Sequence, residues 1–230
     1  KQIGAFNTLL ASPAAPDTMF AGTTSNGNAT IFRSIDGGEN WAQLTSGLPN
    51  GNTRRVELAI SPQDPKYLYA VYSDPTQALE GVYQSTDGGD TWSLKASTPN
   101  ILGYGNTPGQ SWYDLCISVS STNKNQVFVG GINLWRSNNQ GTSWTYIGGY
   151  QFPRVHPDMH YMKFKPGTST LYVGHDGGIS HTSNSGSSWS HVSDGFNITQ
   201  YYKMATSQQR SDLVIGGSQD NSTHIMRGTV

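Results

Sequence analysis

An eight-residue pattern occurs four times along this 230-residue chain, and its spacing restricts the fold more than any single residue does. Each copy begins with Ser or Thr, has Asp or Asn at its third position and Gly at its fifth, and ends with Trp. The copies occupy residues 34–41, 85–92, 137–144 and 182–189, so successive tryptophans are 51, 52 and 45 residues apart. Periods of this length are typical of one small β-sheet repeated around an axis.

Apolar segments around each copy predict four strands per repeat. Two strands precede the pattern and are separated by a turn rich in Pro, Asp, Asn and Ser. A third runs into the pattern, and a fourth leaves from its tryptophan. The first strands are predicted at residues 8–11, 56–60, 113–117, 160–164 and 202–205. Each repeat therefore reads as a four-stranded antiparallel meander.

The repeats predict an all-β chain: a β-propeller of four-stranded antiparallel blades, with about four and a half blades present. We place the blades at residues 1–50, 51–103, 104–150, 151–194 and 195–230, the last one incomplete. Because a propeller must close into a ring, we expect the chain to be a segment of a larger propeller. In the alternative, the N-terminal residues complete the last blade of a small closed ring.

Composition excludes several classes of partner. A formal net charge of −1 gives no attraction for phosphate, so no nucleic-acid partner is expected. No apolar run is long enough to span a bilayer. The single cysteine, Cys116, rules out an internal disulfide framework. The abundance of Ser, Thr, Asn and Gly suggests an extracellular protein, in which Asn28, Asn197 and Asn221 are acceptor sites if the host glycosylates asparagine.

The pattern S-x-D-x-G-x-x-W resembles the Asp-box, or bacterial neuraminidase repeat, of sialidases, sortilin-type propellers and xyloglucan-cleaving glycoside hydrolases. Residues 155–160, 171–178 and 215–221 further resemble a family of large secreted bacterial proteins with sortilin-like propellers, many of them similar to cargo of the type IX secretion route. The resemblance covers nearly the whole chain. It implies a propeller located outside the cell or on the bacterial cell surface.

The repeated pattern is expected to fasten a hairpin rather than to form a site. Its third residue accepts hydrogen bonds from its own turn, its glycine is left-handed, and its tryptophan fills the gap between sheets. Asparagine at two of the third positions indicates that the charge is not needed. The structural residues are Asp36, Trp41, Asp87, Trp92, Asn139, Trp144, Asn184 and Trp189.

The other end of the sheets is the expected site. In such meanders the starts of the first strands and the loops between second and third strands share one face, where the innermost strands converge on the axis. Polar and aromatic side chains are predicted to bind ligand there: Arg54, Arg55, Tyr104, Trp112, Gln200 and Tyr201.

Five carboxylates on this face are candidate catalytic groups: Glu57, Asp114, Asp158, Asp176 and Asp220. A glycosidase needs two carboxyl groups, about 5–5.5 Å apart for retention or about 6.5–9.5 Å apart for inversion. A pair at the wider separation is conceivable here. A sialidase is not expected, because the Arg-Ile-Pro motif that resembles its start is missing.

His156, Asp158 and His160 form the sharpest local constellation. On an extended strand, alternation would place the three side chains on one side, and with His175 they would offer a site to a divalent metal. Alternatively, the trio hydrogen-bonds across neighbouring blades. No other cofactor is expected.

These features predict a secreted or cell-surface module that binds polysaccharide or protein without catalysis. Its expected partners are an extracellular polysaccharide or a protein or peptide, and the remaining blades of the same longer chain. The alternative is a glycoside hydrolase of the xyloglucanase-like type that uses two carboxylates at the channel face.

Overall fold

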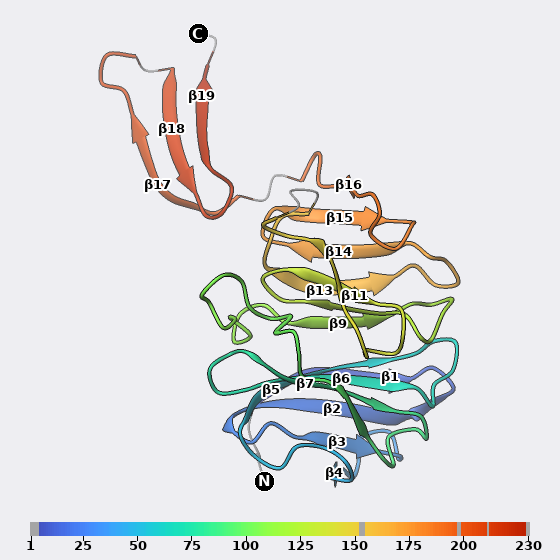
Figure 1. Cartoon of the computed structure of the whole chain (residues 1–230). Helices are drawn as coiled ribbons and strands as arrows, with labels where there is room; N and C mark the ends of the chain where they lie inside the picture. The colour runs from blue at the N-terminus through green and yellow to red at the C-terminus, as the bar shows by residue number, and fades with distance from the viewer. Residues whose placement is uncertain (1–4, 152–154, 197–198, 211, 229–230) are drawn as a thin grey trace.

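The computed structural model describes residues 5–151, 155–196, 199–210 and 212–228, and within these ranges it contains only β-strands, turns and irregular segments (Figure 1). All strand pairs in these ranges are antiparallel. The all-β prediction is therefore confirmed. No helix in the described residues is long and apolar enough to cross a membrane.

In the described residues, successive strands form five groups of three or four, each called a sheet below, and the first two groups are hydrogen-bonded into one eight-stranded sheet. The first contains β1 (Ala5–Ser12), β2 (Ala15–Gly27), β3 (Ile31–Ser34) and β4 (Ala42–Leu44). The second contains β5 (Thr53–Ile60), β6 (Leu68–Ser73), β7 (Leu79–Ser85) and β8 (Ser93–Ala96). The third contains β9 (Cys116–Val119), β10 (Val127–Gly130), β11 (Leu134–Ser137) and β12 (Thr145–Gly148). The fourth contains β13 (Met159–Phe164), β14 (Leu171–His175), β15 (Gly178–Thr182) and β16 (Ser190–His191). The fifth contains β17 (Tyr201–Thr206), β18 (Leu213–Ser218) and β19 (Thr223–Arg227).

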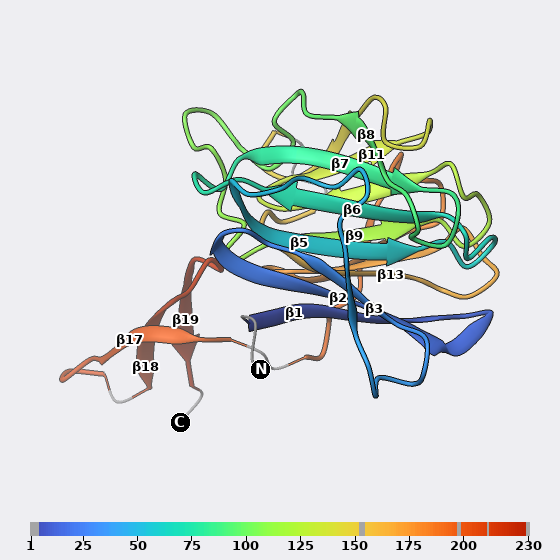
Figure 2. The same ribbon diagram turned by 90° about the horizontal axis from the view of Figure 1, so that it is seen from below.

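The first four sheets stack face to face, with β1, β5, β9 and β13 as neighbouring innermost strands (Figure 1). β2 also pairs with β5 at Thr24 and Arg55, so the first two sheets are joined by backbone hydrogen bonds. The fifth sheet projects away from the stack, which Figure 2 shows from a second direction.

One predicted strand is shorter than expected. The third innermost strand begins at Cys116, whereas the sequence placed its start at Tyr113. The N–H groups of Tyr113 and Asp114 instead donate to Gln110 O at 2.8 and 3.1 Å, which closes a tight turn. The polar residues before Cys116 are therefore held by a turn rather than by the sheet.

Side chains of the middle strands alternate between two cores, because successive residues of a strand point to opposite faces. All six residues of β6 are buried. Leu68 and Tyr72 pack between the first and second sheets, whereas Tyr69 and Val71 pack between the second and third. In β10, Phe128 belongs to the core between the third and fourth sheets.

The repeated turn has the same hydrogen bonds whether it carries Asp or Asn. Asp87 Oδ1 accepts from Ser85 Oγ at 2.7 Å and from Thr91 N at 3.0 Å. Asn139 Oδ1 accepts from Ser137 Oγ and Ser143 N, both at 2.9 Å. Asp36 and Asn184 accept from the matching donors of their own turns.

These bonds also affect the acidity of the two aspartates. Hydrogen bonds from the backbone N–H of Asn40 and the Ser34 hydroxyl hold the pKa of Asp36 at about 2. Bonds from the Thr91 hydroxyl and N–H do the same for Asp87, whose pKa is also about 2. The neutral asparagines fill the same geometry, so the local backbone, rather than the charge, is what the turn requires.

Three of the four repeated tryptophans pack toward the preceding sheet. Trp92 is buried in the core between the first and second sheets, and Trp144 and Trp189 are partly buried against the next two cores. Trp41 is 38% exposed, so the expectation that it fills a gap between sheets is wrong. In the described part of the chain no sheet precedes its own, and its indole N–H donates to Gly38 O at 2.9 Å.

The glycine at the fifth position of the second, third and fourth turns lies directly on the preceding sheet. A Cβ on Gly89 would lie 2.8 Å from Phe20 Cε1, and one on Gly186 would lie 2.7 Å from Ile147 Cδ1. The residue just before the first and the second turn adds a polar link to the following sheet: Arg33 Nη1 donates to Gly88 O at 3.1 Å, and Gln84 Nε2 donates to Gln140 Oε1 at 2.9 Å. The turn thus joins one sheet to the next.

Two adjacent glycines allow this packing to be measured. Gly88 and Gly89 both have positive φ angles, +80° and +93°, but a Cβ on Gly88 would meet no atom within 4 Å. We expect Gly88→Ala to cost about 1 kcal/mol of unfolding free energy from backbone strain alone. Gly89→Ala should cost a further ~1–3 kcal/mol, because its methyl group overpacks Phe20. Chemical denaturation of both variants measures the difference, and equal losses would contradict this role of the turn.

Candidate functional site

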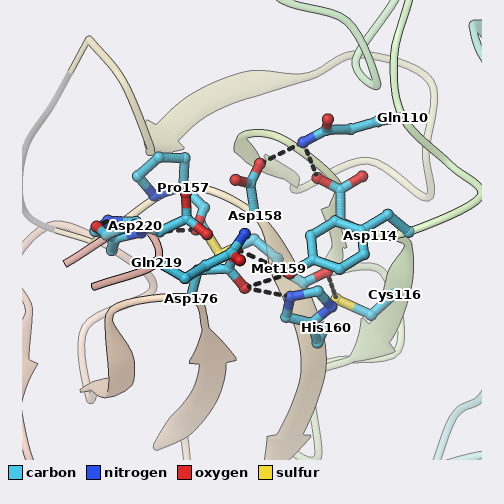
Figure 3. Close-up of polar contacts among 12 residues, drawn as sticks. Gln110, Asp114, Cys116, Pro157, Asp158, Met159, His160, Asp176, Gln219 and Asp220 are labelled. Atoms are coloured by element: carbon cyan, nitrogen blue, oxygen red, sulfur yellow. Dashed lines mark hydrogen bonds and ion pairs between the residues drawn. The ribbon is translucent and has the colours of Figure 1, made fainter. Parts of the chain in front are cut away.

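Four aspartates gather at the end of the sheets opposite the repeated turns, and we call them the carboxylate cluster. Asp114 precedes β9, Asp158 precedes β13, Asp176 follows β14 and Asp220 follows β18. Figure 3 shows all four together. Three sheets therefore contribute to one polar site, on the face where the sequence placed it.

Asp114 and Asp158 share one hydrogen-bond donor. Gln110 Nε2 lies 3.1 Å from Asp114 Oδ2 and 2.7 Å from Asp158 Oδ1 (Figure 3). Asp114 is only 1% exposed, and its Oδ1 has no hydrogen-bond partner. Burial raises the pKa of Asp114 to about 8 and also raises the pKa of Asp158. The two carboxyl groups therefore retain a proton near neutral pH.

Asp176 has the opposite environment. The Tyr113 hydroxyl donates to both of its carboxylate oxygens, at 3.1 and 3.0 Å, and His160 Nε2 lies 2.6 Å from Oδ1. The Tyr113 and His160 rings meet edge to face, with 4.7 Å between their centroids. Asp176 therefore accepts a hydrogen bond from Tyr113 and lies within hydrogen-bond distance of His160, so its carboxyl group is oriented from two sides.

The predicted metal constellation does not form as expected. β13 begins only at Met159, and Asp158 has φ +64°, so His156, Asp158 and His160 do not alternate along one extended strand. His156 Nε2 lies 3.0 Å from Asp220 O, while His175 is buried with Nε2 2.9 Å from Ser180 Oγ.

Within the described residues, no group of three or more His, Cys, Asp and Glu side chains is arranged to hold a metal ion. Burial lowers the pKa of His175 to about 4, so this imidazole is neutral under ordinary conditions. The contacts of His156 and Asp158 follow the alternative interpretation, hydrogen bonding between neighbouring sheets.

Glu57 makes its hydrogen bonds with residues outside the carboxylate cluster. Its Oε1 accepts from Arg55 Nη2 at 2.7 Å and from Asn7 Nδ2 at 2.6 Å. Arg55 Nη1 also donates to Ser111 O at 2.8 Å, so this network links the first three sheets. Alternation along β5 turns Arg54 toward the other side of the strand. Glu57 and Arg55 therefore form an ion pair that holds neighbouring sheets together.

Exposed aromatic rings surround the cluster. The Trp112 side chain is 63% exposed and its ring is tilted against Tyr113, while the backbone N–H of Trp112 donates to Gln77 Oε1 at 3.0 Å. Tyr104 stacks on Tyr150, with ring centroids 4.8 Å apart and planes 16° apart.

Other predicted ligand residues lie on the projecting sheet. Tyr201 contacts the His224 ring within that sheet, and Gln200 O accepts the N–H of Gln219. Among the predicted glycosylation sites, Asn28 is exposed, Asn221 donates to Asp176 O, and Asn197 lies outside the described residues.

Sequence reasoning did not single out Gln110 or Tyr150. Gln110 follows Tyr104, a predicted ligand residue on this rim, by six residues in the same loop, and this proximity was its only signal in the sequence. Tyr150 follows β12 and carried no signal of its own, because the stacking on Tyr104 arises only when the two loops meet.

A cavity of about 560 Å³ runs along the innermost strands β1, β5, β9 and β13. Its lining includes Arg55, Glu57 and His160 at the site end and Pro62 and Pro166 at the other. His160 therefore connects Asp176 with an open space large enough for a ligand.

Comparison with known proteins supports this architecture. The chain is 28% identical over 154 residues to a xyloglucanase of Paenibacillus sp, which covers 63% of the chain and 14% of the relative. It is 30% identical over 139 residues to xyloglucanase Xgh74A of Acetivibrio thermocellus, covering 52% of the chain and 16% of the relative. The chain thus spans about one sixth of these curated relatives. No family model matches it.

Solved structures are similar over nearly the whole chain. The GH74 enzyme of Niastella koreensis matches 92% of this chain and 33% of its own, with a TM-score of 0.59 and 17% identity. An ancestral GH74 enzyme matches 94% of this chain and 27% of its own, with a TM-score of 0.61 and 16% identity. YCF48 from Cyanidioschyzon merolae matches 99% of this chain and 68% of its own, with a TM-score of 0.54 and 12% identity.

The chain has a β-propeller fold. The propeller prediction is confirmed by these likenesses together with the stacked antiparallel sheets, and each sheet is a blade. The site therefore lies at the end of the blades where their innermost strands begin, beside the propeller axis.

The raised pKa of Asp114 predicts how stability depends on pH. Between 3.8 and about 8, the folded chain holds a proton on this carboxyl that the unfolded chain has lost. This group therefore destabilises the fold progressively as pH rises through that window. In Asp114→Asn, we expect stability relative to the wild type to increase from pH 4 to pH 8, measured by urea unfolding. A difference that is constant over this range would contradict the assignment.

Proposed function

We propose that this chain is part of a secreted glycoside hydrolase that acts on a xyloglucan-type polysaccharide at the carboxylate cluster. The observation that carries the proposal is the contrast between a proton-holding pair, Asp114 and Asp158, and an acceptor, Asp176, on the same face. Burial raises the pKa values of Asp114 and Asp158, which suits this pair to an acid role beside a second carboxyl group. The xyloglucanase relatives support this choice of substrate class.

The proposed chemistry uses two carboxyl groups on opposite sides of the scissile bond. Asp158, which is less enclosed than Asp114, donates the proton held by the pair to the leaving glycosidic oxygen. Asp176 acts as the carboxylate partner, either activating water or attacking the sugar. Tyr113 and His160 keep Asp176 oriented from two directions.

The aromatic rim supplies the sugar-binding surface in this proposal. Trp112 presents an exposed indole, and the Tyr104–Tyr150 stack presents a second flat surface. Aromatic faces combine a large apolar area with low conformational freedom, which suits the apolar faces of pyranose rings. The cavity along the innermost strands offers space beside His160.

We further propose that the repeated turns are Asp-boxes of the bacterial neuraminidase type and that the protein works outside the cell. Their shared serine, aspartate and asparagine contacts support the first point. Further blades of the same longer chain are proposed to complete the ring, because three of the four turns pack on a preceding blade whereas Trp41 of the first turn is exposed.

Hydrolysis tests the proposal directly. The full chain should release reducing ends from soluble xyloglucan, and Asp176→Asn should lower kcat at least 100-fold, because it removes the carboxylate partner. Asp64→Asn is the matched control: Asp64 pairs with Lys124 at 2.8 Å, away from the cluster. Its activity should stay within twofold of the wild type. Equal loss in both variants, or no hydrolysis by the wild type, would overturn the enzymatic proposal.

A non-catalytic binding module is the second candidate, because the exposed aromatic rim favours it independently of the carboxylates. Trp112→Ala should weaken xyloglucan binding about tenfold, since it removes one stacking platform worth roughly 1–1.5 kcal/mol. Trp41→Ala serves as the control, because Trp41 is an exposed tryptophan in a repeated turn at the other end. Calorimetry on both variants measures this. Binding of xyloglucan without hydrolysis would favour the non-catalytic module over the hydrolase. An unchanged affinity in Trp112→Ala would show that the aromatic rim does not bind the polysaccharide.

A further inference from the structure

Gln110 is attached to both halves of the acidic pair. Its backbone carbonyl accepts the N–H groups of Tyr113 and Asp114, which fixes the turn that carries Asp114. Its side-chain nitrogen reaches Asp114 Oδ2 and also Asp158 Oδ1, 48 residues further along the chain. One residue therefore sets the position of Asp114 through the backbone and faces both carboxyl groups through the side chain.

Asp158 is fixed independently of Gln110. Its N–H donates to Ile132 O at 3.1 Å, and the next N–H, of Met159, donates to Gly131 O at 2.9 Å. Its left-handed backbone, with φ +64°, turns the side chain toward Gln110 (Figure 3). Backbone hydrogen bonds hold both aspartates in place. The Gln110 amide therefore faces two carboxyl groups whose positions are fixed.

Two opposing influences act on the pair. Burial favours the protonated forms of both groups, the proximity of Asp158 further raises the pKa of Asp114, and the charges of Asp176 and Asp220 further raise the pKa of Asp158. The Gln110 amide donates to both carboxyl groups and favours the ionised forms. Other titratable groups near the pair are Tyr113, Tyr150 and Cys116, whose raised pKa values leave them neutral here.

We propose that Gln110 is a positioning residue that keeps the Asp114–Asp158 pair at one proton, so that Asp158 can donate that proton and recover it. This role extends the proposed hydrolase, whose acid is this pair. Without the amide, the pair holds its proton more tightly and releases it less readily to a leaving group. An amide does not titrate, so Gln110 can donate hydrogen bonds to the two carboxyl groups across the whole working pH range.

The test is a pH titration of the full chain labelled with ¹³C at the aspartate carboxyl carbons. In the wild type, one carboxyl signal should titrate near pH 8, and it should disappear in Asp114→Asn. Gln110→Leu removes the donor at similar volume and should move that midpoint up by about one pH unit, the usual effect of a hydrogen bond to a charged group. The alkaline limb of hydrolysis should move in the same direction.

Gln126→Leu is the matched control, because Gln126 donates to Asn138 Oδ1 at 2.9 Å beside a repeated turn and faces neither carboxyl group. Its titration should match the wild type. If Gln110→Leu does not fold, Gln110→Met provides the same loss of the donor with an unbranched side chain. An unchanged midpoint in the folded variant would overturn the inference.

The two proposals fail separately. A shifted midpoint in a protein that hydrolyses no xyloglucan supports the role of Gln110 on the pair and overturns the enzymatic proposal. Hydrolysis with an unchanged midpoint and pH profile in Gln110→Leu supports the enzyme and overturns the role of Gln110.

Discussion

The structure depends on the contact between the repeated turn of one blade and the sheet before it. The turn presents a left-handed glycine to the preceding core, and at Gly89 and Gly186 the approach leaves no room for a Cβ. Polar links from Arg33 and Gln84 reinforce the same contact. Because this packing lies at one end of the blades, it sets how closely they stack and therefore how their innermost strands converge at the other end.

The site depends on that convergence, yet its chemistry comes from irregular backbone. Asp114 is held by a tight turn, Asp158 by a left-handed residue and Asp176 by the loop after β14. Inside a strand, successive side chains must point to opposite faces of the sheet. Residues beyond the ends of a strand are free of this requirement, so carboxyl groups from neighbouring sheets can point toward one another. Burial then raises the pKa values of Asp114 and Asp158, which a fully solvated surface would not do.

The sequence predicted the blades and the face of the site, because both follow from periodicity: the turn recurs, and the strand order around it is constant. It could not predict which side chains meet. The expected alternation of His156, Asp158 and His160 failed because one left-handed residue precedes β13, and no local pattern announces that conformation. Gln110 and Tyr150 were missed because their partners lie in distant loops. The burial of Trp41 was wrongly expected because it depends on a neighbouring sheet rather than on its own turn.

The alternation of β6 and β10 between two cores has a consequence for unfolding. Leu68 and Tyr69 are adjacent in the chain but stabilise different interfaces, so loss of one blade uncovers part of the core of its neighbours. The unfolding free energy of the stack therefore comes largely from the cores that each blade shares with its immediate neighbours, as in a linear array of repeats. β17 and β19, whose residues are all exposed, share no such core with the stack. Amide hydrogens of the fifth sheet should therefore exchange through local opening, with a free energy of opening well below the one needed to expose the amide hydrogens of β6.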